Sequence, residues 1–125
     1  ENGMPTEVPD TTTVNKGKYT WWREGPTSSD FIHEDVTPNF FRRSFKYIKE
    51  RSLEENPFFL YLALPSPHTP ILPTEEWQNK SNLNPYGDFV LQVDHTVGQV
   101  YKALEEAGFS ENKSSCNSKE KKRHP

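Results

Sequence analysis

Cysteine is almost absent from this chain of 125 residues, which contains Cys116 and no other. One cysteine can form neither an intrachain disulfide nor a cysteine-cluster metal site, so neither kind of scaffold is expected. Cys116 lies in a polar segment that gives no sign of a preorganised site, which argues against a catalytic thiol. Long apolar runs are also missing, and hydrophobic residues make up only 31% of the chain. We therefore expect no membrane span, and no signal peptide is visible.

Several motifs with well-defined chemistry are missing as well. The chain has no glycine-rich phosphate loop, no nucleophile elbow, no His-Glu-x-x-His and no clustered carboxylates at metal-ligand spacing. After Asn112 it carries five basic residues and one acidic residue. Short lysine-rich ends are more often solvated than bound to nucleic acid, so we expect no nucleic-acid partner.

The most informative stretch runs from residue 56 to residue 73. Residues 58–64 are an unbroken apolar and aromatic run between Pro57 and Pro65, too short for a helix of usual length. This pattern predicts a strand buried on both faces, typical of a parallel sheet covered by helices. Four prolines at positions 65, 67, 70 and 73 then prevent regular structure, and His68 lies among them. In open α/β sheets, ligands bind where such a strand ends.

Helices are predicted on both sides of this stretch. Residues 37–55 carry apolar side chains at helical spacing, with Thr37 as the N-cap and Pro38 at the first helical position. Residues 85–107 form the longer predicted helix, with Gly108 as its stop signal and a short helical turn from Thr74 before it.

Polar side chains of the longer predicted helix are expected to lie away from its apolar face. They are Asp88, Gln92, Asp94, His95 and Gln99. Because Asp94 and His95 are neighbours in sequence, they do not share a helical face, and a metal pair there is not expected.

The N-terminal segment, residues 1–36, is irregular, with possible short strands at 11–14 and 18–22. Tyr19, Trp21 and Trp22 are its densest aromatic group. Packing against a neighbouring surface is the favoured role for these rings. Trp21 and Trp22 are kept as weak candidates for the wall of a substrate site.

The order helix, buried strand, proline-rich loop and long helix predicts an α/β fold for residues 37–109. One strand cannot form a sheet, so we expect a partial core that folds marginally by itself. Residues 110–125 lack any apolar period and are predicted to be a disordered tail.

His68 is the residue with the clearest chemical potential. An imidazole titrates near ~6.5, so it can exchange protons near neutral pH or bind an anion when charged. For an isolated loop histidine, a hydrogen bond to a backbone carbonyl is the commoner role.

Two segments together closely resemble the type I sulfatases, the arylsulfatase family. The first is Pro57-Phe-Phe-Leu-Tyr-Leu-Ala-Leu-Pro-Ser-Pro-His-Thr-Pro70. The second is Tyr86-Gly-Asp-Phe-Val-Leu-Gln-Val-Asp-His-Thr-Val-Gly98, followed by Leu104-Glu-Glu-Ala-Gly108. The resemblance covers residues from about 30 to 112 and implies a fragment of an alkaline-phosphatase-like α/β sandwich.

The resemblance implies hydrolysis of a sulfate monoester on a sulfated small molecule or glycan. In that family a formylglycine made from Cys/Ser-x-Pro-x-Arg attacks sulfur, and aspartates with Asn/Gln hold calcium. The family histidine of the His-x-Pro motif contacts sulfate and protonates the leaving oxygen. His68 matches this motif, so the resemblance favours a functional role for His68 over a purely structural hydrogen bond to a carbonyl. Asp94 matches a recurrent helix aspartate with a structural role. The resemblance also implies a periplasmic, extracellular or lysosomal location.

The departures from the family pattern set further expectations. The chain has no Cys/Ser-x-Pro-x-Arg motif, lacks the paired aspartates for calcium, and leaves the family pattern after Asn112. We therefore expect an internal piece of a sulfatase with a foreign or frame-shifted tail, inactive alone and without a calcium site. Two alternatives stay open: a non-catalytic binding module, and a piece of a related phosphoesterase or phosphonate hydrolase.

Overall fold

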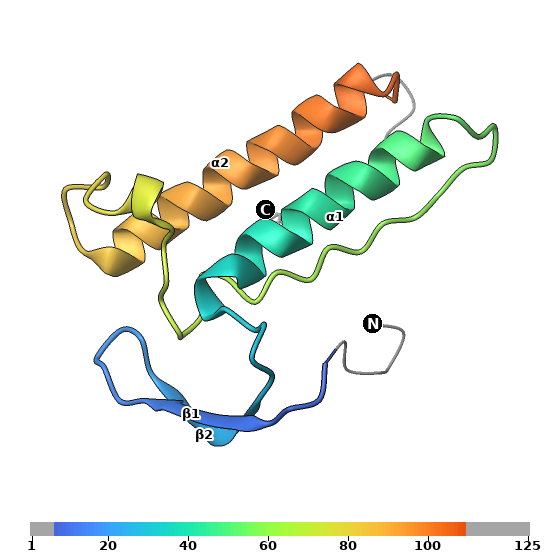
Figure 1. Cartoon of the computed structure of the whole chain (residues 1–125). Coiled ribbons are helices and arrows are strands. Elements are labelled where there is room, and N and C mark those ends of the chain that lie inside the picture. The colour runs from blue at the N-terminus through green and yellow to red at the C-terminus, as the bar shows by residue number, and fades with distance from the viewer. Residues whose placement is uncertain (1–6, 110–125) are drawn as a thin grey trace, which may run out of the picture.

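The computed structural model describes residues 7–109, so the predicted disordered tail lies outside the described residues (Figure 1). Its elements follow one another as β1 (Thr11–Asn15), β2 (Trp22–Thr27), η1 (His33–Asp35), α1 (Val36–Arg51), η2 (Glu75–Trp77) and α2 (Pro85–Glu106). Together they form a small α/β unit, as predicted. The larger sandwich implied by the resemblance stays a prediction.

The two long helices lie side by side and run in the same direction, and the chain between them returns as an extended segment (Figure 1). The apolar core between these parts consists of Phe41 and Ile48 from α1, Ile71 from the loop and Phe89 from α2. Burying side chains of this size contributes about 1.5–3 kcal/mol each. Helix α1, the proline-rich loop and α2 therefore form one packed body.

Helix α1 starts close to the predicted position but is shorter and capped differently. Thr37 is not the N-cap: it is buried in the first turn, where its hydroxyl hydrogen-bonds the hydroxyl of Ser66. Pro38 also lies in the first turn, where its missing N–H removes no helical hydrogen bond. The helix ends at Arg51, four residues before the predicted end, because the chain tightens there: the Leu53 N–H donates to the Glu50 carbonyl at 3.3 Å.

Helix α2 agrees with its sequence signals at both ends. Asn84 is the N-cap, and its side chain accepts a hydrogen bond from the Gly87 N–H at 3.0 Å. At the other end Gly108 has a φ of 80°, and the Phe109 N–H donates to the Leu104 carbonyl at 2.9 Å. These bonds satisfy terminal backbone groups that the helix itself leaves free.

The predicted strands in the N-terminal segment form an antiparallel hairpin, with one correction. Strand β1 lies as expected, but β2 begins at Trp22, so residues 18–21 belong to the connecting loop. The cause is the Asn15 side chain, which accepts hydrogen bonds from the Gly17 N–H at 2.8 Å and the Thr20 hydroxyl at 3.1 Å. This Asx-type arrangement turns the chain away from the ladder before pairing resumes.

The apolar run at 58–64 is extended but is not a strand, and it is not buried on both faces as predicted. Among the described residues its backbone makes one hydrogen bond, from the Leu64 N–H to the Leu62 carbonyl at 3.2 Å. Phe58, Leu60, Leu62 and Leu64 are half-buried, whereas Phe59 is 86% and Tyr61 78% exposed. A strand requires a neighbouring strand, and the described residues place none beside this run.

Candidate functional site

His68 lies in the loop that follows the extended segment, as predicted, and the loop fixes its ring. Its backbone N–H donates to the Pro65 carbonyl at 3.1 Å, which closes a turn. Ring atom Nδ1 lies 2.7 Å from the Thr69 carbonyl oxygen. Because a carbonyl oxygen only accepts, Nδ1 carries a hydrogen and donates it. The peptide bonds before Pro67 and Pro70, which flank His68, are cis.

The hydrogen bond at Nδ1 leaves Nε2 as the chemically available nitrogen of His68. The side chain is exposed, and within residues 7–109 no protein group hydrogen-bonds Nε2. When the ring is protonated, Nε2–H can donate a hydrogen bond to an anion or transfer a proton to a leaving oxygen. The hydrogen bond to a backbone carbonyl, the commoner role of a loop histidine, is present, and it also orients the ring.

Two contacts attach the His68 loop to the rest of the unit. On one side, the Ser66 hydroxyl is hydrogen-bonded to the Thr37 hydroxyl in the first turn of α1. On the other, the Ile71 N–H donates to the Tyr19 carbonyl in the β1–β2 loop at 2.7 Å, and Ile71 itself is buried. His68 is therefore positioned where α1, the hairpin and the proline-rich loop meet.

A shallow, open cleft of about 620 Å³ lies beside His68. Its lining residues are Lys18, Tyr19, Pro67, His68, Thr69, Ile71 and Tyr86. None of them is a carboxylate, and Lys18 adds a second basic group to His68. The cleft therefore suits a negatively charged ligand.

The other residues of the cleft were not found as a site from the sequence. Tyr19 was noted only as part of an aromatic group, Tyr86 only as the first residue of the second sulfatase-like segment, and nothing singled out Lys18. A hydrogen bond between segments about fifty residues apart, from the Ile71 N–H to the Tyr19 carbonyl, brings the β1–β2 loop to the His68 loop. Local sequence patterns carry no signal for a contact of this range.

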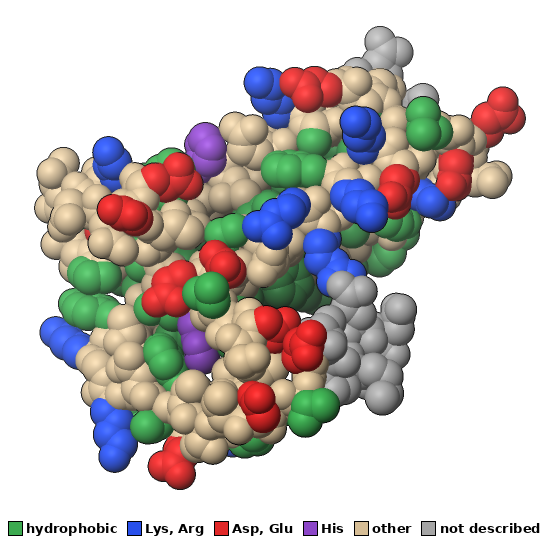
Figure 2. All heavy atoms as spheres, viewed as in Figure 1, with side chains coloured by type: hydrophobic (Ala, Val, Ile, Leu, Met, Phe, Trp, Pro, Cys, Tyr) green, Lys and Arg blue, Asp and Glu red, His purple; other side chains and the backbone are tan. Residues whose placement is uncertain are grey.

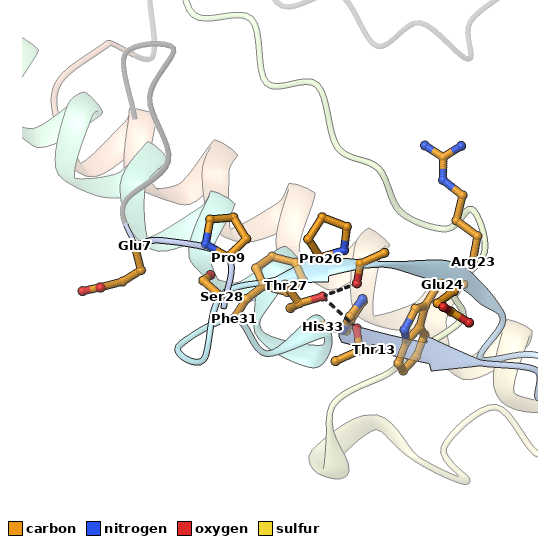
Figure 3. Close-up of a pocket in the computed structure, with 12 residues that line it drawn as sticks. Glu7, Pro9, Thr13, Arg23, Glu24, Pro26, Thr27, Ser28, Phe31 and His33 are labelled. Carbon is orange, nitrogen blue, oxygen red and sulfur yellow. Dashed lines mark hydrogen bonds between the residues drawn. The ribbon is translucent and has the colours of Figure 1, made fainter. Parts of the chain in front are cut away.

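The weak candidates Trp21 and Trp22 lie away from the cleft beside His68. Trp22 lines a different hollow, of about 830 Å³, on the hairpin (Figure 3). Its ring stacks on His33 with centroids 4.0 Å apart, and Phe31 meets His33 edge-on at 4.8 Å. Trp21 is 52% exposed and lines neither hollow. The stacking of Trp22 is the packing role favoured from the sequence.

The hollow on the hairpin is a weaker candidate for an anion site than the cleft beside His68. Figure 3 shows Glu7, Arg23 and Glu24 around it, so both signs of charge are present. The threonine hydroxyls of Thr13 and Thr27 that face it hydrogen-bond each other at 2.8 Å. The mixed charge of this hollow makes it less suited to an anion than the cleft beside His68.

Two polar residues of α2 are buried, contrary to the expectation that they lie away from the packed face. Asp88 accepts hydrogen bonds from the Asn79 N–H at 2.8 Å and the Ser81 N–H at 2.7 Å. Gln92 accepts one from the Thr74 N–H at 2.9 Å. Their burial is possible because each binds backbone donors of the preceding loop.

The hydrogen bonds to Asp88 also change its acidity. Those from the side chain and backbone N–H of Ser81 are the largest cause and hold the pKa of Asp88 below its ordinary value. Burial acts in the opposite direction, and the N–H groups of Asn79 and Lys80 contribute further lowering. Asp88 is therefore an ionised anchor for the turn before α2 rather than a proton donor.

Asp94 and His95, further along α2, are both exposed. The His95 ring lies 5.0 Å from the ring of Trp77 in η2, tilted by 46°. No contact links either of them to His68.

The described residues do not fit a calcium site. Residues 7–109 contain no group of three or more His, Cys, Asp or Glu side chains that could hold a metal ion. No step proposed below passes through a metal.

In the same part of the chain, residues 7–109, no helix is both long and apolar enough to cross a membrane. Lys, Arg, Asp and Glu side chains are interspersed over the visible face of the helices (Figure 2).

Comparison with known proteins identifies the family to which this chain belongs. The family model described as Sulfatase matches residues 5–114, which includes both helices, the hairpin and the His68 loop. The chain belongs to the sulfatase family. The resemblance drawn from the two sequence segments is thereby confirmed. No solved structure gives a significant match.

Sulfatase relatives from distant organisms support this assignment. The N-acetylgalactosamine-6-O-sulfatase of Bacteroides thetaiotaomicron is 29% identical over 86% of the chain and 21% of its own length. The N-acetylgalactosamine-6-sulfatase of Canis lupus familiaris is 28% identical over 77% of the chain and 18% of its length. A protein named Sulfatase from Formosa agariphila is 38% identical over 54% of the chain and 14% of its length. The sulfatase chain described here thus spans about a fifth of these relatives.

Proposed function

We propose that this chain supplies the substrate-contacting histidine of a sulfatase that hydrolyses sulfate monoesters. The observation that carries the proposal is the His68 ring, whose Nδ1 is committed to the Thr69 carbonyl while Nε2 is available beside an anion-suited cleft. Membership of the sulfatase family supplies the reaction class. The cleft's lack of carboxylates supports a bound sulfate, which carries negative charge throughout the reaction.

In the proposed step, the bond between sulfur and the leaving oxygen breaks as a nucleophile bonds to sulfur. The leaving alkoxide takes the proton from Nε2 of His68, which ends the step as a neutral imidazole. Proton delivery of this kind contributes about 10²–10⁴-fold to a rate. The positive charge of the protonated ring also offsets the charge on sulfate before the proton moves.

The nucleophile and the calcium ion are assigned to parts of the enzyme other than the described residues. The chain lacks a Cys/Ser-x-Pro-x-Arg motif, and residues 7–109 contain no metal-type cluster. We accordingly propose that catalysis belongs to a longer protein and that the 125-residue chain binds sulfate esters without turnover.

The substrate proposed is a sulfated sugar, handled outside the cytoplasm. Two of the relatives carry names that specify a sulfated amino sugar. The tyrosine rings of Tyr19 and Tyr86 in the cleft suit the apolar face of a sugar ring. An aryl sulfate is the next candidate on the same grounds.

Nuclear magnetic resonance of the chain labelled with ¹⁵N-histidine tests this proposal. Addition of galactose 6-sulfate is expected to shift the His68 ring signals while those of His33 and His95, outside the cleft, stay in place. His68→Asn is expected to remove the binding, because asparagine can keep the bond to the Thr69 carbonyl but has no atom at the Nε2 position. His95→Asn is the matched control.

Two results would count against the proposal. One is binding of galactose 6-sulfate that His68→Asn leaves unchanged. The other is a clear preference for galactose 6-phosphate, which would favour the related phosphoesterase reading. Circular dichroism of each variant checks that the helices are retained.

A further inference from the structure

A second basic group, Lys18, lines the cleft opposite the His68 loop. It comes from the β1–β2 loop, so the two basic residues are carried by separate segments of the chain. The cleft, at about 620 Å³, has room for more than a sulfate group and can hold a sugar-sized ligand. A ligand bound at His68 would thus extend toward the β1–β2 loop.

The ammonium of Lys18 is not neutralised by an acid within the described residues. Its ammonium instead lies over the neighbouring Tyr19 ring, whose centroid is 5.2 Å from Nζ. By contrast, helix-surface residues such as Lys46, Lys102 and Arg51 pair with glutamates three or four positions on. An aromatic face holds a cation without cancelling its charge, so Lys18 stays available to an anion.

The loop that carries Lys18 is braced on both sides of it. Asn15 Oδ1 accepts from the Gly17 N–H before Lys18 and from the Thr20 hydroxyl after it. The carbonyl of Tyr19 accepts from the Ile71 N–H, three residues beyond His68, at 2.7 Å. Gly17 has no room for a side chain, since a Cβ there would lie 2.3 Å from the Thr20 hydroxyl oxygen. These contacts fix the backbone of Lys18 relative to the His68 loop.

We propose that Lys18 is a specificity residue that binds a second anionic group of the substrate, a further sulfate or a carboxylate on the same sugar. This inference rests on the proposed function, because His68 is taken to hold the sulfate ester being cleaved. Tyr19 and Tyr86 line the same cleft and offer aromatic surface for the sugar ring. The enzyme would then prefer sugars that carry two negative groups.

The test compares galactose 6-sulfate with galactose 4,6-disulfate in binding titrations of the whole chain, followed by nuclear magnetic resonance. The wild-type chain is expected to bind the disulfate about fivefold more tightly, the size of a partly exposed ion pair. Lys18→Gln is expected to weaken binding of the disulfate more than binding of the monosulfate, so that this preference is lost. Lys16→Gln is the matched control, because Lys16 is in the same loop but does not line the cleft.

A second variant tests the bracing of the loop. Asn15→Ala removes the acceptor of both bracing hydrogen bonds and is expected to weaken the preference for the disulfate while the lysine itself is retained. Unfolding is monitored by circular dichroism, so that loss of the hairpin is distinguished from loss of charge.

The outcomes separate the inference from the proposed function. A preference for the disulfate that persists in Lys18→Gln, or that Lys16→Gln removes equally, would overturn the role of Lys18 while leaving His68 untouched. Monosulfate binding that survives His68→Asn would overturn the proposed function instead.

Discussion

The ring of His68 is oriented by the loop that carries it. The Thr69 carbonyl holds Nδ1–H at 2.7 Å, which sets the tautomer and the direction of Nε2 before any ligand arrives. A ring held this way loses little further freedom on binding, so more of the interaction energy remains for the ligand. The same hydrogen bond explains why asparagine is a sharper probe of His68 than alanine.

Asp88 is the residue for which a pH effect can be predicted. Asp88→Asn is expected to lower the Tm of the chain at neutral pH, because the amide replaces a charged acceptor of the Asn79 and Ser81 N–H groups. The pKa of Asp88 is lowered in the folded chain, so its ionisation stabilises the fold above the unfolded pKa. That contribution is lost as pH falls through the lowered folded pKa.

The measurement is a series of thermal melts between neutral and acidic pH. The Tm difference between wild type and Asp88→Asn should be largest near neutrality and should shrink below a pH of about 4. Asp94→Asn, an exposed aspartate on the same helix, is the control and should change the Tm little at any pH. Equal effects of the two substitutions would show that Asp88 is not the anchor.

At this scale the sequence predicted some placements and missed others. The loop position of His68 could be predicted because its proline neighbours form a local motif, and its catalytic role stays a prediction. Lys18 was missed as a cleft residue, because its placement depends on the contact between the Tyr19 carbonyl and the Ile71 N–H. Asp88 and Gln92 were assigned to the wrong environment, since polarity alone predicts exposure and the loop that satisfies them lies elsewhere in the chain.

Among the secondary-structure elements, α2 was predicted with the greatest accuracy. Its apolar spacing lies within the helix and Gly108 lies beside it, so both signals act locally; the N-cap, Asn84, was not predicted. The apolar run at 58–64 was predicted as a strand. That prediction is wrong, because strand pairing depends on other segments of the chain. Its alternation of half-buried and exposed side chains is nevertheless strand-like.

The two faces of the run at 58–64 give a prediction about stability. Leu62→Ala is expected to lower the free energy of unfolding by about 1–2 kcal/mol, because this side chain is half-buried and truncation leaves an unfilled space. Phe59→Ser should change it by less than about 0.5 kcal/mol, because the ring is 86% exposed. Urea unfolding followed by circular dichroism measures both.

A larger loss of unfolding free energy for Phe59→Ser than for Leu62→Ala would mean that the segment presents its other face to the helices. Phe58→Ala serves as a positive control. Its ring meets Tyr47 at 5.6 Å and Phe109 at 5.2 Å, so its loss should be clearly destabilising.

At the scale of the whole molecule, the chain is a small α/β unit of the sulfatase family. Four apolar residues form its fully buried core, and the His68 loop is attached to both α1 and the hairpin. The family could be predicted from two separated motifs because their combination is specific. Tertiary placement of the hairpin, which completes the cleft, could not be predicted, since its contacts with the His68 loop are made by backbone groups common to all residues.

The most direct test of the central claim is the activity of the complete product of the gene that encodes these residues. It should be assayed with galactose 6-sulfate and galactose 6-phosphate, as wild type and as His68→Asn. We expect hydrolysis of the sulfate ester, with kcat/KM lowered by about 10²–10⁴-fold in His68→Asn. Faster hydrolysis of the phosphate ester, or a His68→Asn enzyme as active as wild type, would contradict the account.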